Sequence, residues 1–151
     1  MIKIICIGKV KEAFYREAIA EYQKRLSKYT KLEIIEVPDV TTSNIEENIK
    51  KEANMIQRYI GSKDYVITLE IEGTQVSSEA FAQKIDSIYQ THSTITFIIG
   101  GSYGLDQSIK KMSHWSLSFS KLTFPHQLFR IVLLEQIYRA YKIQNHESYH
   151  K

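Results

Sequence analysis

Cysteine is nearly absent from this chain. Cys6 is the only one among 151 residues, so no disulfide can form within the chain. An exported protein held together by disulfides is therefore not expected. Long apolar runs are missing as well: none approaches the ~20 residues of a membrane-spanning helix, and the run around Cys6 is too short for a signal peptide. We expect a cytoplasmic protein in which Cys6 is a small buried residue.

A large excess of charge of one sign is also missing. The chain has 20 Lys and Arg against 17 Asp and Glu, which gives a net charge of +3. This balance is compatible with a polyanionic partner but does not require one. There is no repeat, no low-complexity segment and no linker. We therefore expect one globular domain over residues 1–151, long enough to bury roughly two-thirds of its unfolded surface.

Hydrophobic periodicity predicts that strands and helices alternate along the chain. Short apolar runs predict strands at residues 2–7, 32–37, 65–71, 95–99 and 115–119. Apolar stripes of helical period lie between them, over residues 11–28, 45–60, 78–88 and 105–112, and again after Pro125. Ser43, with Glu46 three residues on, and Ser78 are predicted helix caps. This alternation predicts an α/β fold with a mostly parallel sheet in three layers.

The last helix is apolar on nearly every side. Its apolar residues are Leu128, Phe129, Ile131, Val132, Leu133, Leu134, Ile137, Tyr138, Ala140 and Tyr141. An apolar perimeter indicates burial all round, and in a domain this small one side is expected to face a second subunit. A charge at Leu133 or Ile137 should then dissociate a dimer. The alternative is a central helix in a monomer.

Two loops combine the residues that a ligand site needs. The strand at residues 96–99 runs into Gly100-Gly101-Ser102-Tyr103-Gly104, which has neither Walker nor dinucleotide-binding spacing. The loop is either a tight turn without a ligand or a backbone cradle for an uncharged or zwitterionic cofactor. Residues 118–130 bring hydroxyls, Lys121, His126 and Arg130 to one strand-to-helix junction. Such loops at the ends of neighbouring strands build ligand sites in α/β proteins.

Other polar residues are ranked by their neighbours in the sequence. His126 and Arg130 share a helix face at an end that favours anions. A functional role for His126 and a structural one, usual for a histidine near a helix start, both stay open on this pattern. His92 and His114 have no such company and are expected on the surface. Glu135 and Arg139 are spaced for an ion pair. No histidines, cysteines or carboxylates have metal-ligand spacing, so no metal is expected.

The C-terminal tail is aromatic and basic. Residues 147–151 read Glu-Ser-Tyr-His-Lys. Tails of this kind are normally frayed. One that stacks on a base and meets phosphate is the alternative, and the spacing alone does not decide between the two.

Several motifs, in this order and spacing, resemble one family over essentially the whole chain. They are residues 66–70, 97–105, 118–126, Arg130, residues 135–140 and the final Tyr149-His150-Lys151. The chain is similar to the ribosomal RNA large subunit methyltransferase H family, the smallest SPOUT (α/β-knot) methyltransferases. The resemblance implies a deep C-terminal trefoil knot over roughly residues 66–151, a rare feature among protein folds. It also implies a homodimer.

The resemblance further implies that S-adenosylmethionine is the cofactor and that it binds bent within the knot. The implied cofactor contacts are Leu69, Gly100, Phe119, Ser120, Lys121, Leu122, Thr123 and Phe124. Because this cofactor has no phosphate, the missing phosphate loop is in keeping with it.

The implied reaction is methylation of N3 of a pseudouridine in helix 69 of 23S ribosomal RNA, on assembled ribosomes. His126 or His150 is expected to handle the N3 proton, while Arg130 and Lys151 hold RNA phosphate or the developing enolate. Tyr149 is expected to stack on a base. Ribosome shape would supply recognition, together with basic residues: Lys9, Lys11, Arg16, Lys110 and Lys111.

Three other readings remain. The first is a SPOUT methyltransferase acting on another RNA, such as transfer RNA. The second is a non-catalytic ribosome-maturation factor that uses the pocket as a sensor. The third is a flavodoxin-like binding module, which would have an unknotted sheet and no affinity for S-adenosylmethionine.

Overall fold

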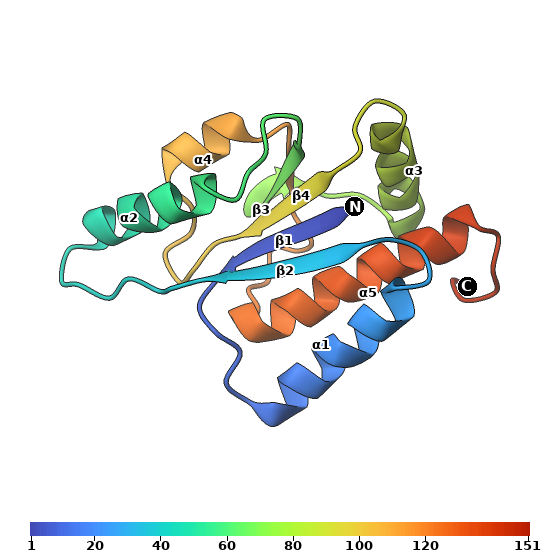
Figure 1. Ribbon diagram of the computed structural model, residues 1–151, viewed down its shortest axis with the longest axis horizontal. Coiled ribbons are helices and arrows are strands. Elements are labelled where there is room, and N and C mark those ends of the chain that lie inside the picture. The colour runs from blue at the N-terminus through green and yellow to red at the C-terminus, as the bar shows by residue number, and fades with distance from the viewer.

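Strand and helix alternate along the whole chain in the computed structural model, which describes residues 1–151. The elements are β1 (Ile2–Ile7), α1 (Ala13–Leu26), β2 (Leu32–Val37), α2 (Ile45–Gln57), β3 (Tyr65–Thr74), α3 (Ser78–Tyr89), β4 (Ile95–Ile99), α4 (Gln107–Met112), β5 (Trp115–Leu117) and α5 (His126–Gln144). The strands form one sheet in the order β2-β1-β4-β3-β5, and every pair is parallel (Figure 1). The predicted α/β class and parallel sheet are confirmed.

Helices cover both faces of the sheet and make three layers (Figure 1). Side chains alternate along β1, so that Ile2, Ile4 and Cys6 join the core beneath α1, α3 and α5, while Ile5 and Ile7 join the core beneath α2 and α4. Cys6 is fully buried as expected, and burial raises the pKa of its thiol to about 11. The covered faces explain why the strands read as continuous apolar runs.

Two helices are capped by a residue one position away from the predicted cap. Asn44, not Ser43, caps α2, because its side chain accepts a hydrogen bond from the Glu47 backbone N–H at 3.2 Å. Ser77 caps α3 in the same way at 3.1 Å. Ser78 is the first helical residue instead, and its hydroxyl donates to Gln136 of α5 at 2.8 Å. The Ser78 hydroxyl thereby ties α3 to α5.

Helix α5 is the most deeply buried helix, and its own chain supplies the cover. It packs between α1 and α3, against the sheet (Figure 1). Leu133 and Ile137 are 0% exposed within this core. The prediction that a charge at either residue would separate two subunits is therefore wrong, because both side chains lie inside one chain. Only Leu128, Phe129, Ile131 and Val132 of its apolar perimeter remain half-exposed.

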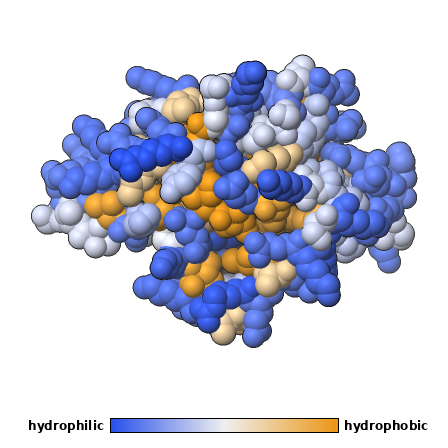
Figure 2. All heavy atoms as spheres, in the orientation of Figure 1, coloured by the Kyte–Doolittle hydropathy of each residue, from blue (hydrophilic) through white to orange (hydrophobic).

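The sheet leaves apolar surface at one edge. Strand β2 has a single neighbour and only one fully buried residue, Val37. Figure 2 shows hydrophobic atoms gathered across the middle of this face, over β2 and the helices beneath it. None of the five helices combines the length and the apolar content that a membrane crossing requires.

Candidate functional site

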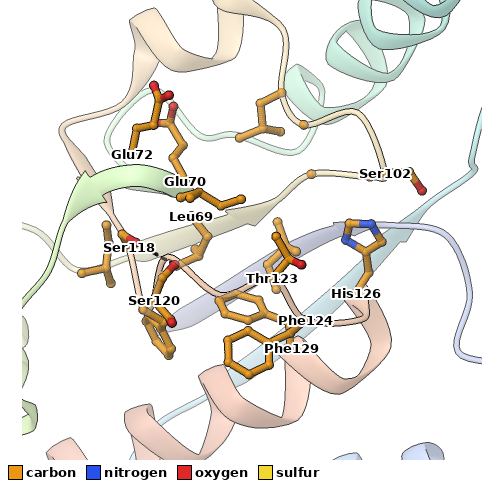
Figure 3. Close-up of a pocket in the computed structure, with 18 of the residues that line it drawn as sticks. Leu69, Glu70, Glu72, Ser102, Ser118, Ser120, Thr123, Phe124, His126 and Phe129 are labelled. Atoms are coloured by element: carbon orange, nitrogen blue, oxygen red, sulfur yellow. Dashed lines mark hydrogen bonds between the residues drawn. The ribbon is translucent and has the colours of Figure 1, made fainter.

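A cavity of about 650 Å³ opens at the carboxyl ends of β3, β4 and β5 (Figure 3). Its size lies in the range of small-molecule sites, and the carboxyl edge is where open α/β sheets bind ligands. Three segments form its walls: the end of β3, the glycine turn after β4, and the loop between β5 and α5. The lining residues are Leu69, Glu70, Ile71, Glu72, Ile99, Gly100, Gly101, Ser102, Gly104, Leu105, Lys110, Leu117, Ser118, Phe119, Ser120, Leu122, Thr123, Phe124, His126 and Phe129.

The glycine turn forms one wall because its backbone folds back on itself. Gly104 has a φ of +82° and its N–H donates to the Gly101 carbonyl at 3.1 Å. A Cβ on Gly100 would lie 2.9 Å from the Gly104 carbonyl group, so only glycine allows this closure. The turn therefore presents main-chain groups to the cavity in place of side chains.

The loop after β5 forms the facing wall and is shaped by its own hydroxyls. The Ser120 hydroxyl accepts from the Leu122 N–H at 2.9 Å, and Ser118 donates to the Ser120 carbonyl at 3.3 Å. The Phe119 and Phe129 rings meet edge to face at 5.2 Å between centroids. The wall thus combines exposed main-chain and hydroxyl groups with an apolar floor (Figure 3).

The end of β3 contributes carboxylates. Glu70 accepts hydrogen bonds from Thr68 and Ser116, each at 2.7 Å, and lies 3.5 Å from the Lys110 ammonium. Burial pushes the pKa of Glu70 upward, but these hydrogen bonds and the Lys110 charge outweigh it and leave the pKa below its ordinary value. Glu70 is therefore ionised at neutral pH, and its carboxylate is held by Thr68, Ser116 and Lys110.

His126 is the cavity's histidine. It is the first residue of α5 and half-buried, and it lies on the side of the cavity nearest Ser102 and Thr123 (Figure 3). Burial, and then the positive charge of Arg130, lower its pKa, while Asp39 acts in the opposite direction. A lowered pKa favours the neutral imidazole at neutral pH, which is the form that accepts a proton.

Arg130 does not share the cavity with His126. Its side chain is 3% exposed, and its guanidinium donates to the carbonyls of Ile7 and Gly8 at 2.8 and 2.7 Å. It also bonds Glu36 at 2.8 Å. Arg130 lies beneath the end of β1 with its guanidinium bonded to protein groups, so it is not exposed for the expected contact with RNA phosphate. Arg130 instead anchors the start of α5, and with it His126.

The C-terminal tail is anchored, not frayed. The Tyr149 hydroxyl donates to Glu135 at 3.0 Å, and His150 contacts Arg139 at 3.0 Å and Glu79 at 2.7 Å. The predicted Glu135–Arg139 ion pair is present at 2.6 Å. Arg139 lies about 20 Å beyond His126 along the helix axis, at 1.5 Å per residue. One chain therefore does not bring His126 and His150 into a single site.

The predicted cofactor residues gather in the cavity, with one exception. The exception is Lys121, whose side chain is exposed and does not contribute to the lining. Sequence reasoning did not single out Ile71, Glu72 or Phe129 as lining residues. Charged residues alternating after an apolar strand, as at 70 and 72, are a signal that could have pointed to this wall.

The other two histidines considered in the sequence, His92 and His114, lie at the amino ends of the strands, opposite the cavity. His114 is exposed, accepts from the Val66 N–H at 2.9 Å and stacks on Tyr65 at 4.9 Å, with His92 beside it. Neither histidine lines the cavity. No group of three or more potential metal-ligating side chains lies close enough together to hold an ion.

Comparison with known proteins places this chain in a family. The family described as "Predicted SPOUT methyltransferase" matches residues 1–150. A Streptococcus uberis protein named ribosomal RNA large subunit methyltransferase H is 54% identical over 99% of each chain, and a Clostridium botulinum protein of the same name is 52% identical over the same share.

One solved structure shares the fold. It is described as that of a probable methylase family protein from Haemophilus influenzae Rd KW20, and it matches with a TM-score of 0.57 and 13% identity. The match covers 99% of this chain and 70% of that one. At this identity the likeness concerns the fold alone.

Proposed function

Since the chain belongs to the SPOUT methyltransferases, in the ribosomal RNA large subunit methyltransferase H family, we propose that it methylates 23S ribosomal RNA. The proposed target atom is N3 of a pseudouridine in helix 69, on assembled ribosomes in the cytoplasm. The proposed methyl donor is S-adenosylmethionine. Residues 1–151 act as one domain, with the trefoil knot over roughly residues 66–151.

The cavity carries this proposal, because its chemistry suits S-adenosylmethionine. A cradle of backbone at Gly100, where a Cβ would not fit, can hydrogen-bond polar edges of a ligand. Leu69, Leu122 and Phe124 offer apolar surface to an adenine ring. The one lysine of the lining, Lys110, is paired with Glu70, so no free cation is present for a phosphate.

The cofactor contacts are proposed to come from the residues expected on sequence grounds. They are Leu69, Gly100, Phe119, Ser120, Leu122, Thr123 and Phe124, together with the backbone of Lys121. When bound, S-adenosylmethionine supplies an activated methyl group on its sulfonium. The protein's task is then to orient the two reactants, to exclude water and to remove one imide proton.

His126 is the proposed acceptor of that proton. It lies on the cavity wall, and its lowered pKa keeps the imidazole neutral at neutral pH. Arg130 fixes its position through the Ile7 and Gly8 carbonyls, as a residue that acts through His126.

The tail is proposed to act in the site of a second subunit. Tyr149, His150 and Lys151 lie far along α5 from their own cavity, so they serve a site only if a homodimer brings them to the partner's cavity. There Tyr149 would stack on a base, and His150 and Lys151 would meet the RNA.

Cations flank the cavity on two sides and are proposed to meet ribosomal RNA. Lys9 and Lys11 are exposed in the loop after β1, Arg16 is exposed on the first turn of α1, and Lys111 is exposed on α4. The backbone N–H of Lys11 donates to Gln127 of α5 at 3.0 Å, which ties the first group to the His126 end of the site. These charges add affinity for phosphate to recognition by shape.

The test is transfer of tritium from labelled S-adenosylmethionine to ribosomes that lack this methylation, with free 23S RNA and transfer RNA as parallel substrates. We expect label on ribosomes alone, mapped to the helix 69 pseudouridine. Label on transfer RNA, or at another ribosomal position, would overturn the proposed target. Cofactor binding without transfer to any of them would indicate a maturation factor.

A further inference from the structure

Strand β3 arches at its carboxyl end, and the arch forms one wall of the cavity. Leu69 and Thr74 both pair with Leu117 of β5, so residues 70–73 protrude from the ladder. The chain can return because position 73 is glycine: a Cβ there would lie 2.8 Å from backbone atoms of Ser116 and Leu117. Irregularities of this kind redirect side chains beside active sites.

The arch brings two carboxylates to the cavity, and they differ in their partners. Glu70 is held by Thr68, Ser116 and Lys110, and so it fastens β3 to β5 and α4. Glu72 lines the same cavity but is exposed, and its carboxylate has neither an ion pair nor a side-chain hydrogen bond. Glu72 is therefore free to interact with a ligand.

Glu72 also decides the net charge of the cavity. Besides it, only Glu70, Lys110 and His126 among the lining residues can carry charge. Lys110 offsets Glu70, and the lowered pKa of His126 favours its neutral form. One negative charge remains. Figure 3 shows the two glutamates at one end of the cavity and the Phe124 and Phe129 rings at the other.

We infer that Glu72 makes the cavity favour the sulfonium cofactor over its demethylated product. S-adenosylmethionine carries a positive sulfur, whereas S-adenosylhomocysteine has a neutral thioether and is otherwise alike. The negative charge of Glu72 attracts the positive sulfonium but not the neutral thioether, so S-adenosylhomocysteine dissociates more readily. The inference rests on the proposed function, because it takes this cavity as the cofactor site.

The magnitude follows from the exposure of Glu72. Attraction between solvent-exposed charges is screened by water and salt, and it changes affinity by roughly two- to fivefold. Such a factor is small for binding but acts on every turnover, because product release precedes the next cofactor. It should also shrink as ionic strength rises.

The test is calorimetric titration of the purified protein with S-adenosylmethionine, S-adenosylhomocysteine and sinefungin, which carries a protonated amine in place of the sulfonium. We expect Glu72→Gln to weaken both cationic ligands by about two- to fivefold and to leave the thioether unchanged. Glu72→Asp should retain most of the preference. Glu33→Gln, at an exposed residue of β2 remote from the cavity, is the matched control.

The outcomes separate this inference from the proposed function. Equal weakening of all three ligands would mean that Glu72 only packs against them, and unchanged affinities would mean that it does not face the sulfur; either result overturns the inference. If the wild-type protein binds none of the three, the proposed function fails and the inference fails with it.

Discussion

His126 is the side chain on which the proposed proton transfer depends, and its surroundings set the pH at which it can act. Only the neutral imidazole accepts a proton. Burial and the Arg130 charge place its pKa below the ordinary value of about 6.5. As the pH falls, wild-type turnover should therefore decline with a midpoint below pH 6.5. A single-turnover rate profile on ribosomes, from pH 5 to 8, measures this.

Substitution of His126 gives a second test of its role as the proton acceptor. His126→Gln keeps a polar side chain of similar length but cannot take the proton, so turnover should fall by about 10²–10⁴-fold. S-adenosylmethionine affinity should change little, because the proposed contacts with the cofactor come from other residues. His92→Gln, on a surface remote from the cavity, is the control. A His126→Gln enzyme with wild-type turnover would exclude this histidine as the base.

The sequence was sufficient to pick out His126 and Arg130 as a pair, but not to separate their roles. Helical spacing places both on one face of α5. In the structure, however, His126 lines the cavity, whereas Arg130, one turn further along α5, contacts the end of β1. The different roles of the two residues depend on the carbonyls of Ile7 and Gly8, which accept hydrogen bonds from Arg130 and belong to a remote part of the chain. Local pattern does not encode it.

At the scale of elements, α5 shows how an apolar perimeter can be misread. Periodicity reports that every side of the helix is apolar, but it does not say which elements cover each side. Here α1, α3 and the sheet of the same chain cover most of it. The arch of β3 could not be predicted for a similar reason. Residues 70–73 protrude because Leu69 and Thr74, on either side of them, both pair with β5, and this pairing is not visible in the local sequence.

The buried position of Leu133 gives a direct prediction of stability. Leu133→Ala should lower the free energy of unfolding by about 2–5 kcal/mol, because it leaves a cavity in the core beneath the sheet. Val132→Ala, on the half-exposed side of the same helix, should cost about 1 kcal/mol. Urea denaturation followed by circular dichroism measures both. A folded, monomeric Leu133→Asp variant would contradict this account and restore the interface first predicted there.

At the scale of the whole molecule, the layers could be predicted and the strand order could not. Alternating strands and helices dictate a parallel sheet with two covered faces. The order β2-β1-β4-β3-β5 depends on where each crossover returns, and with it the gathering of three loops around one cavity. A ligand site was predicted from the residues of those loops, but the geometry that brings the loops around one cavity required the fold.

Exposed apolar residues indicate where a second copy would bind. Ile71, Leu122 and Phe124 are 54%, 74% and 37% exposed, and all three line the cavity. Val76, at 40%, lies with Phe124 and Val132 in an adjoining hollow. A homodimer that covers this surface would shield the apolar rim and bring the partner's tail toward the cavity.

A charge at Val76 should therefore separate the subunits without unfolding the chain. We expect Val76→Asp to be a folded monomer by sedimentation and circular dichroism, to bind S-adenosylmethionine, and to lose methyl transfer because the partner's tail is missing. Tyr59→Asp, at an equally exposed residue beyond α2 and outside the cavity lining, should leave dimer and activity intact. A dimeric Val76→Asp protein would move the interface elsewhere. A monomer that still methylates ribosomes would show that each chain holds a complete site, and the tail would then have no catalytic part.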